Sequence, residues 1–166
     1  MILHQMNANF DILVALRRQQ SNIYLLIDGA RFKNIHAFIY EQEERPDYIP
    51  LYRGTYFETA LEVSPCLVRI TNIKVGLLPW FAKDTEDKRN AMLLVSDLSL
   101  KDLAVHFQEY LEAKLPNYDV VLFRFYDPQI FEVITNHMND PHVIKMLTPI
   151  KLAYWKSLEN YKCLSA

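Results

Sequence analysis

Three aspartates follow apolar runs that are expected to form strands: Asp28 in LLIDG, Asp97 in LLVSD and Asp127 in RFYDP. Ligands bind at the carboxyl ends of strands in open α/β sheets, and clustered acids there could hold Mg²⁺ for phosphoryl transfer. The alternative is that each carboxylate caps the following helix by accepting hydrogen bonds from free backbone N–H groups. Since no DxD motif or other acid pair joins the three residues, we predict capping and no metal site.

Arg124 lies within the apolar run of residues 119–126, which predicts a strand. A buried, unpaired guanidinium would cost several kcal/mol, so this side chain requires an acidic partner. Asp127 and Asp28 are the nearest candidates, because each is expected at the end of a strand. We expect a structural ion pair; the alternative is an arginine that binds a ligand.

No other group of residues has the spacing of a catalytic or cofactor site. The chain has three glycines and neither phosphate-loop motif, the two cysteines lack zinc-site spacing, and neither Ser64 nor Ser96 lies in a GxSxG motif. The histidines form no HExxH or HxxxH pattern; they are His4, His36, His106, His137 and His142. We therefore predict no enzymatic activity, no cofactor and no metal.

The composition favours a globular protein that acts on neither nucleic acid nor membrane. Among 166 residues, 51% are hydrophobic, and 18 Lys and Arg against 20 Asp and Glu give a net charge of −2. This balance disfavours binding to a phosphate backbone. The first twenty residues lack the charge order of a secretory signal, and no apolar run reaches the ~18 residues of a membrane span. We expect a cytoplasmic protein with reduced cysteines.

The hydrophobic pattern predicts one α/β domain over residues 1–166, with a mixed or parallel sheet of about four to five strands flanked by helices; an α+β arrangement is the alternative. The expected strands are short apolar runs, at residues 22–28, 66–71, 91–96, 119–126 and 150–155. Helical spacing or capping signals predict helices at residues 1–20, 32–39, 55–63, 99–115 and 142–147, and another that begins at Asp127-Pro128. Residues 72–90 are expected to be a surface excursion.

The chain is rich in aromatic residues, with ten Tyr, nine Phe and two Trp. Most should fill the core, but aromatic residues are also enriched at protein interfaces. Those next to proline or in irregular segments are the best candidates for contacts with a partner protein, and they are Tyr48, Tyr52, Trp80, Phe81 and Trp155. The alternative is that they too belong to the core.

Four segments in a fixed order resemble one bacterial family. They are YLLIDGA at residues 24–30, PLYRGTYFETALEVSPCLVRI at 50–70, LLVSDLSLKDLAVHFQEYLEAKLP at 93–116 and VLFRFYDPQIFEVI at 121–134. Together they are similar to the family called domain of unknown function 4123, over about residues 22–155. The run Arg-Phe-Tyr-Asp-Pro at residues 124–128 is the most specific piece.

The resemblance implies an adaptor chaperone of type VI secretion. Such a protein binds one toxic effector in the cytoplasm and helps to load it onto a VgrG-type spike, without being a catalyst. The family motif implies structural roles for Asp28, Tyr52, Gly54, Arg124, Tyr126, Asp127 and Pro128. Two alternatives remain open at this point: a metal-dependent phosphoryl-transfer enzyme that uses the strand-end aspartates, and an unrelated protein-interaction domain.

Overall fold

The computed structural model describes residues 1–7, 9–83, 90–117, 119–157 and 160–166. Across these residues, seven strands form one sheet in which every neighbouring pair is antiparallel. In spatial order the strands are β1 (Ile2–Gln5), β9 (Asn160–Ser165), β8 (Leu152–Ser157), β5 (Ala91–Ser96), β2 (Asn22–Ile27), β4 (Cys66–Ile70) and β3 (Asp47–Pro50).

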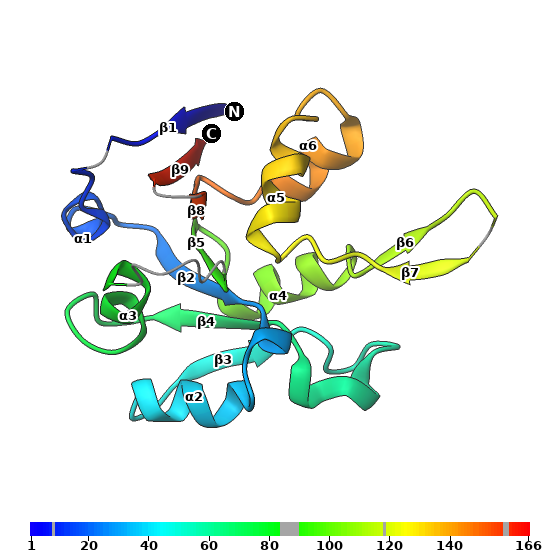
Figure 1. The fold of residues 1–166 in the computed structure, drawn as a ribbon, viewed down its shortest axis with the longest axis horizontal. Coiled ribbons are helices and arrows are strands. Elements are labelled where there is room, and N and C mark those ends of the chain that lie inside the picture. The colour runs from blue at the N-terminus through cyan, green and yellow to red at the C-terminus, as the bar shows by residue number, and fades with distance from the viewer. Residues whose placement is uncertain (8, 84–89, 118, 158–159) are drawn as a thin grey trace.

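Helices cover both faces of this sheet (Figure 1). One face packs against α1 (Ile12–Leu16), α2 (Ile35–Gln42) and α3 (Leu77–Lys83). The other packs against α4 (Leu100–Gln108), α5 (Pro128–Thr135) and α6 (Pro141–Leu147). Two short 3-10 helices, η1 (Gly29–Arg31) and η2 (Glu58–Val63), follow β2 and β3 along the chain.

The central strand β2 shows why its sequence is a continuous apolar run. Ile23, Leu25 and Ile27 pack on the α1–α3 side, whereas Tyr24 and Leu26 pack on the α4–α6 side. Successive side chains of a strand point to opposite faces, so a strand covered on both sides needs apolar residues at every position.

The prediction of a mixed or parallel sheet of about four to five strands was wrong. Apolar runs separated by helices are typical of parallel sheets, but here the same pattern arises because helices cover both faces of an antiparallel sheet. The strands that the pattern did not reveal are β1, β3 and β9. They lie at or near the sheet edges, and their polar and exposed residues break the apolar run.

The expected strand at residues 119–126 is also corrected. Only Val120–Leu122 forms a strand, β7, which pairs with β6 (Glu112–Lys114) in a second sheet; that sheet has two strands within the described residues. This hairpin extends away from the body of the molecule (Figure 1). Arg124 therefore lies after the strand, in the connection that leads to α5.

Three predicted helices are shorter than expected. Residues 55–63 contain only the 3-10 helix η2, which begins at Glu58 and has non-helical backbone angles at Ala60. Residues 1–20 contain β1 and the five-residue α1. Asp11 caps the N-terminus of α1, where its side chain accepts hydrogen bonds from the backbone N–H groups of Leu13 and Val14. The helix predicted at residues 99–115 ends at Gln108, and the spacing of Leu111 and Leu115, which was assigned to this helix, also fits a strand with period two. The predicted excursion at residues 72–90 contains α3, and its residues 84–89 lie outside the described part.

Candidate functional site

Asp28 and Asp127 lie close together in the folded chain, and each caps the helix that follows it. Asp28 directly follows β2, and its Oδ1 accepts a hydrogen bond from the backbone N–H of Ala30 at 3.3 Å. Asp127 precedes α5, and its Oδ1 accepts from the backbone N–H of Gln129 at 2.9 Å, with Pro128 at the first helical turn. The predicted capping is confirmed for both residues.

Two arginines join these carboxylates into one closed network, which we call the ion-pair ring and define as Asp28, Arg31, Arg124 and Asp127. Arg31 donates from Nε to Asp28 Oδ2 at 3.3 Å and from Nη2 to Asp127 Oδ2 at 2.7 Å. Arg124 donates from Nη2 to Asp28 Oδ2 at 2.6 Å, and the same nitrogen lies 3.7 Å from Asp127 Oδ2. The ion pair predicted for Arg124 is therefore present.

The ring places buried negative charge next to half-exposed positive charge. The side chain of Asp28 is 0% exposed and that of Arg124 is 38% exposed. Burial opposes the charge of Arg124, but the adjacent Asp28 carboxylate outweighs it, so the pKa of the guanidinium lies above its usual value. All four carboxylate oxygens of the two aspartates accept hydrogen bonds from a guanidinium or a backbone N–H. The two guanidinium groups beside these carboxylates would repel a metal cation at this site.

Sequence reasoning missed Arg31. The available signal was its spacing from Asp28 in DGAR, since residues three apart in a helical turn can form an ion pair. Its contact with Asp127, 96 positions away in the sequence, depends on the tertiary fold and has no local signal.

Tyr52 and Tyr126 form a buried pair, and Tyr126 lies, like Arg124, in the connection between β7 and α5. The hydroxyl groups of Tyr52 and Tyr126 are hydrogen-bonded at 2.7 Å, and burial raises the pKa of both side chains. The backbone N–H of Tyr52 donates to Ser64 Oγ at 3.0 Å. The pair therefore ties the segment after β3 to the Arg-Phe-Tyr-Asp-Pro connection.

Gly29 allows two backbone segments to meet beside the ring. A Cβ at this position would lie 2.0 Å from the carbonyl oxygen of Ser64, so only glycine fits without moving the backbone. Gly54, another residue of the family motif, has φ +72°, in the left-handed region that favours glycine. Both glycines therefore have structural reasons for their identity.

Asp97 lies far from the other two aspartates. Asn22 pairs with Ser96 and Ile27 pairs with Ala91, so Asp97 is at the opposite end of β2 from Asp28. Six strand residues span about 20 Å. The neighbouring strands β2 and β5 would bring Asp28 and Asp97 to the same edge only if they were parallel, and their antiparallel register separates the two carboxylates. Asp97 instead contacts Lys151 at 2.6 Å, and Ser99 caps α4, so the predicted cap is wrong for Asp97.

We expect Mg²⁺, Mn²⁺ or Zn²⁺ to leave the melting temperature unchanged. A ligand that binds only the native state raises its stability, and the carboxylate oxygens of the ring already have donors. Within the described residues, no group of three or more His, Cys, Asp or Glu side chains could hold a metal ion. A rise of several degrees at micromolar metal, measured by differential scanning fluorimetry, would contradict this prediction.

The cysteines are buried and unpaired with each other. Burial raises the pKa of the Cys66 thiol to about 12, and it also raises the pKa of Cys163. Because the thiolate is the reactive form, neither side chain has the environment of a nucleophile.

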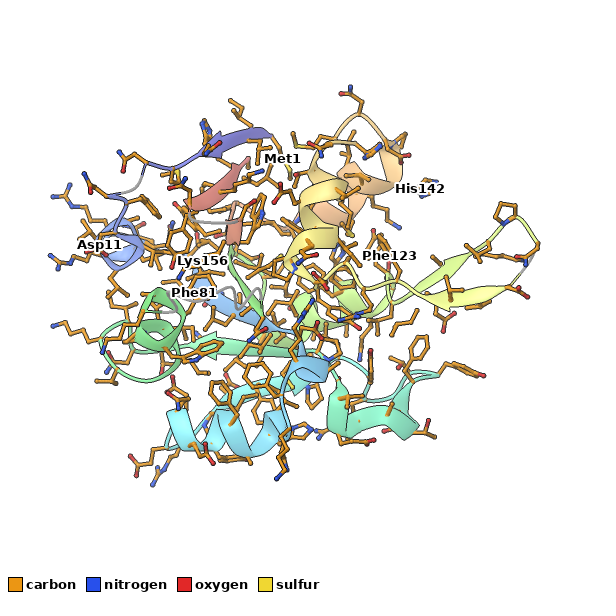
Figure 2. All side chains as sticks on the ribbon, viewed as in Figure 1. Met1, Asp11, Phe81, Phe123, His142 and Lys156 are labelled. Atoms are coloured by element: carbon orange, nitrogen blue, oxygen red, sulfur yellow. The ribbon has the colours of Figure 1, made fainter. Side chains whose placement is uncertain are left out.

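The candidate partner-binding aromatics divide into two groups. The structure buries Tyr52, Phe81 and Trp155, which favours the alternative that they belong to the core. Phe81 packs from α3 with α1 and α2 against one face of the sheet, and it is labelled on that side in Figure 2. Tyr48 and Trp80 are half-buried: the Tyr48 hydroxyl is 3.1 Å from His36 Nδ1, and the Trp80 ring packs edge-on against Phe38. Tyr48 and Trp80 therefore pack against the core on the α1–α3 side and remain partly exposed.

No helix within the described ranges combines the length and the apolar character needed to cross a bilayer.

One comparison with known proteins gives a match. The model of the family described as domain of unknown function (DUF4123) matches residues 23–144, more than half of the chain. This range contains the ion-pair ring, both tyrosines of the buried pair and the hairpin of β6 and β7. No curated protein and no solved structure matches the chain. The chain belongs to the DUF4123 family.

Proposed function

We propose that this chain is a non-catalytic adaptor chaperone, which binds one type VI secretion effector in the cytoplasm and helps to load it onto a VgrG-type spike. The observation that carries the proposal is the family match over residues 23–144, which includes the most specific piece of the resemblance, the run at residues 124–128.

The ion-pair ring supports a structural role for the family's motif residues. Arg124 and Asp127 both lie in the motif, and their charges are balanced by Arg31 and Asp28 rather than left free for a substrate. The ring joins the end of β2 to the start of α5, two segments far apart in the sequence. Such a contact stabilises one arrangement of the fold, which a binding protein needs as a rigid base.

The experiment is copurification from the native operon. The tagged chain is purified from its own bacterium, and bound proteins are identified by mass spectrometry, with an equally tagged fluorescent protein as the control. We expect a stoichiometric toxin encoded beside this chain, with or without the spike protein.

Two outcomes would overturn the proposal. The first is a chain that elutes alone when the neighbouring toxin is expressed. The second is hydrolysis of a phosphomonoester by the purified chain with added Mg²⁺, which would support the enzyme alternative instead.

A further inference from the structure

The hairpin of β6 and β7 presents an apolar face outside the core. We call residues 111–117 and 119–123 the arm. The pairs Ala113 with Val121 and Glu112 with Leu122 fix its register. The backbone N–H of Phe123 donates to the Leu111 carbonyl at 2.7 Å and extends the same register toward the body.

This register separates the side chains of the arm into two faces. Opposed residues and residues two apart share a face, so one face carries Leu111, Phe123, Ala113, Val121 and Leu115, and Asp119 lies opposite Leu115 at its outer end. The opposite face carries Glu112, Leu122, Lys114 and Val120. The first face is an apolar stripe that ends at the Asp119 carboxylate, whereas the second alternates apolar and charged groups.

The stripe begins in the core and ends in solvent. Leu111 is 1% exposed and Phe123 is half-buried where the arm joins the body (Figure 2). Farther out, Val121 is 37% exposed and Leu115 is 41% exposed. No described strand pairs with the outer edge of β6 or of β7. An isolated two-stranded ribbon is marginally stable in water, so an apolar stripe on such a ribbon favours a covering partner.

The charges around the arm indicate which partner fits. Residues 51–63 meet the base of the arm, because Gln108 at the end of α4 donates from Nε2 to the carbonyl oxygens of Leu51 and Arg53. Residues 51–63 and 109–123 carry five carboxylates against Arg53 and Lys114; with Lys145, which lies 3.9 Å from Glu109, the local net charge is −2, equal to that of the whole chain. All eight charged residues are exposed; the acids are Glu58, Glu62, Glu109, Glu112 and Asp119.

We infer that the apolar face of the arm is a docking surface for a partner segment that alternates apolar residues with lysine or arginine. The apolar side of the segment covers Val121 and Leu115, and its basic residues meet the surrounding carboxylates. The inference rests on the proposed function in that the segment would belong to the effector.

The test uses peptides and does not require the effector. Three fluorescently labelled twelve-residue peptides are titrated with the full chain by fluorescence anisotropy: alternating Leu-Lys, alternating Leu-Glu and alternating Ser-Lys. We expect the Leu-Lys peptide to bind at least tenfold more tightly than either of the others, because it alone has both the apolar side and the positive charge.

Two variants on neighbouring positions of β7 locate the site. Val121→Lys places a charge on the apolar stripe, and Val120→Lys adds the same charge to the opposite face, where the side chain is 57% exposed. Val121→Lys should weaken binding of the Leu-Lys peptide at least tenfold, whereas Val120→Lys should change it less than twofold. Circular dichroism melts verify that both variants are folded.

Equal binding of the Leu-Lys and Ser-Lys peptides, or equal loss in the two variants, would overturn the inference. Copurification of the neighbouring toxin by Val121→Lys as efficiently as by Val120→Lys would leave the adaptor function standing and remove the arm as its surface.

Discussion

Trp155→Ala should lower the free energy of unfolding by about 3–5 kcal/mol, the usual cost of removing a large aromatic side chain from a core. Trp155 lies on β8 with 0% exposure, and its ring packs edge-on against Phe131 of α5 at 5.1 Å between centroids. For a chain of this length the melting temperature should fall by about 10 °C or more. Urea denaturation followed by circular dichroism measures the effect.

Val133→Ala is the matched control for this prediction. Val133 lies on α5, two positions from Phe131, but it is 57% exposed, so its truncation should cost less than about 0.5 kcal/mol. A Trp155→Ala protein as stable as the native chain would show that Trp155 is not a core residue, and its role as a partner contact would then have to be reconsidered.

Asp28→Ala should lower the free energy of unfolding by about 3 kcal/mol, because it removes the fully buried member of the ion-pair ring. Breaking a buried ion pair on one side leaves the other charge uncompensated, at a cost of about 3–5 kcal/mol. Arg31 and Arg124 are both partly exposed, and water therefore lowers this cost toward the bottom of the range. The helix cap at Ala30 is lost as well.

Asp97→Ala provides the control for Asp28→Ala. Both residues follow a central strand and form an ion pair, but the side chains of Asp97 and Lys151 are 65% and 50% exposed. Solvent screens an exposed ion pair, so Asp97→Ala should destabilise the chain much less than Asp28→Ala. Equal destabilisation in the two variants, measured by urea denaturation, would contradict a special role for the ring.

The local elements of the fold were predictable where one signal dominates. The strands at residues 22–27, 66–70 and 91–96 follow from apolar runs, and the start of α5 follows from an acid before proline. Strand direction was not predictable from these runs, because burial on both faces gives the same pattern in parallel and antiparallel sheets. The same ambiguity concerns Asp97, which a parallel sheet would bring to the same edge as Asp28.

The candidate site was predictable in part for a related reason. A charge in an apolar segment requires a partner, so Arg124 led to Asp28 and Asp127. Arg31 and the tyrosine pair depend on contacts between distant segments, for which the sequence has no local signal. The arm was hidden inside a predicted helix and a predicted strand, because Leu111 and Leu115 fit both periods.

These observations separate two roles within the chain. The motif residues Arg124, Tyr126 and Asp127 hold the fold together, while the arm leaves apolar side chains exposed outside the core. In an adaptor of this kind, the motif residues would stabilise the fold, and the effector would bind to a different surface, the arm.

The most direct measurement combines binding and stability in one variant, Arg124→Gln, with the copurified effector as the ligand. Isothermal titration calorimetry at a temperature where the variant is folded gives Kd, and a thermal melt of the same sample gives Tm. We predict a lower Tm, since Asp28 loses a partner, and a Kd within twofold of the native value. A native Tm together with a loss of effector binding would contradict the structural role and make Arg124 a recognition residue.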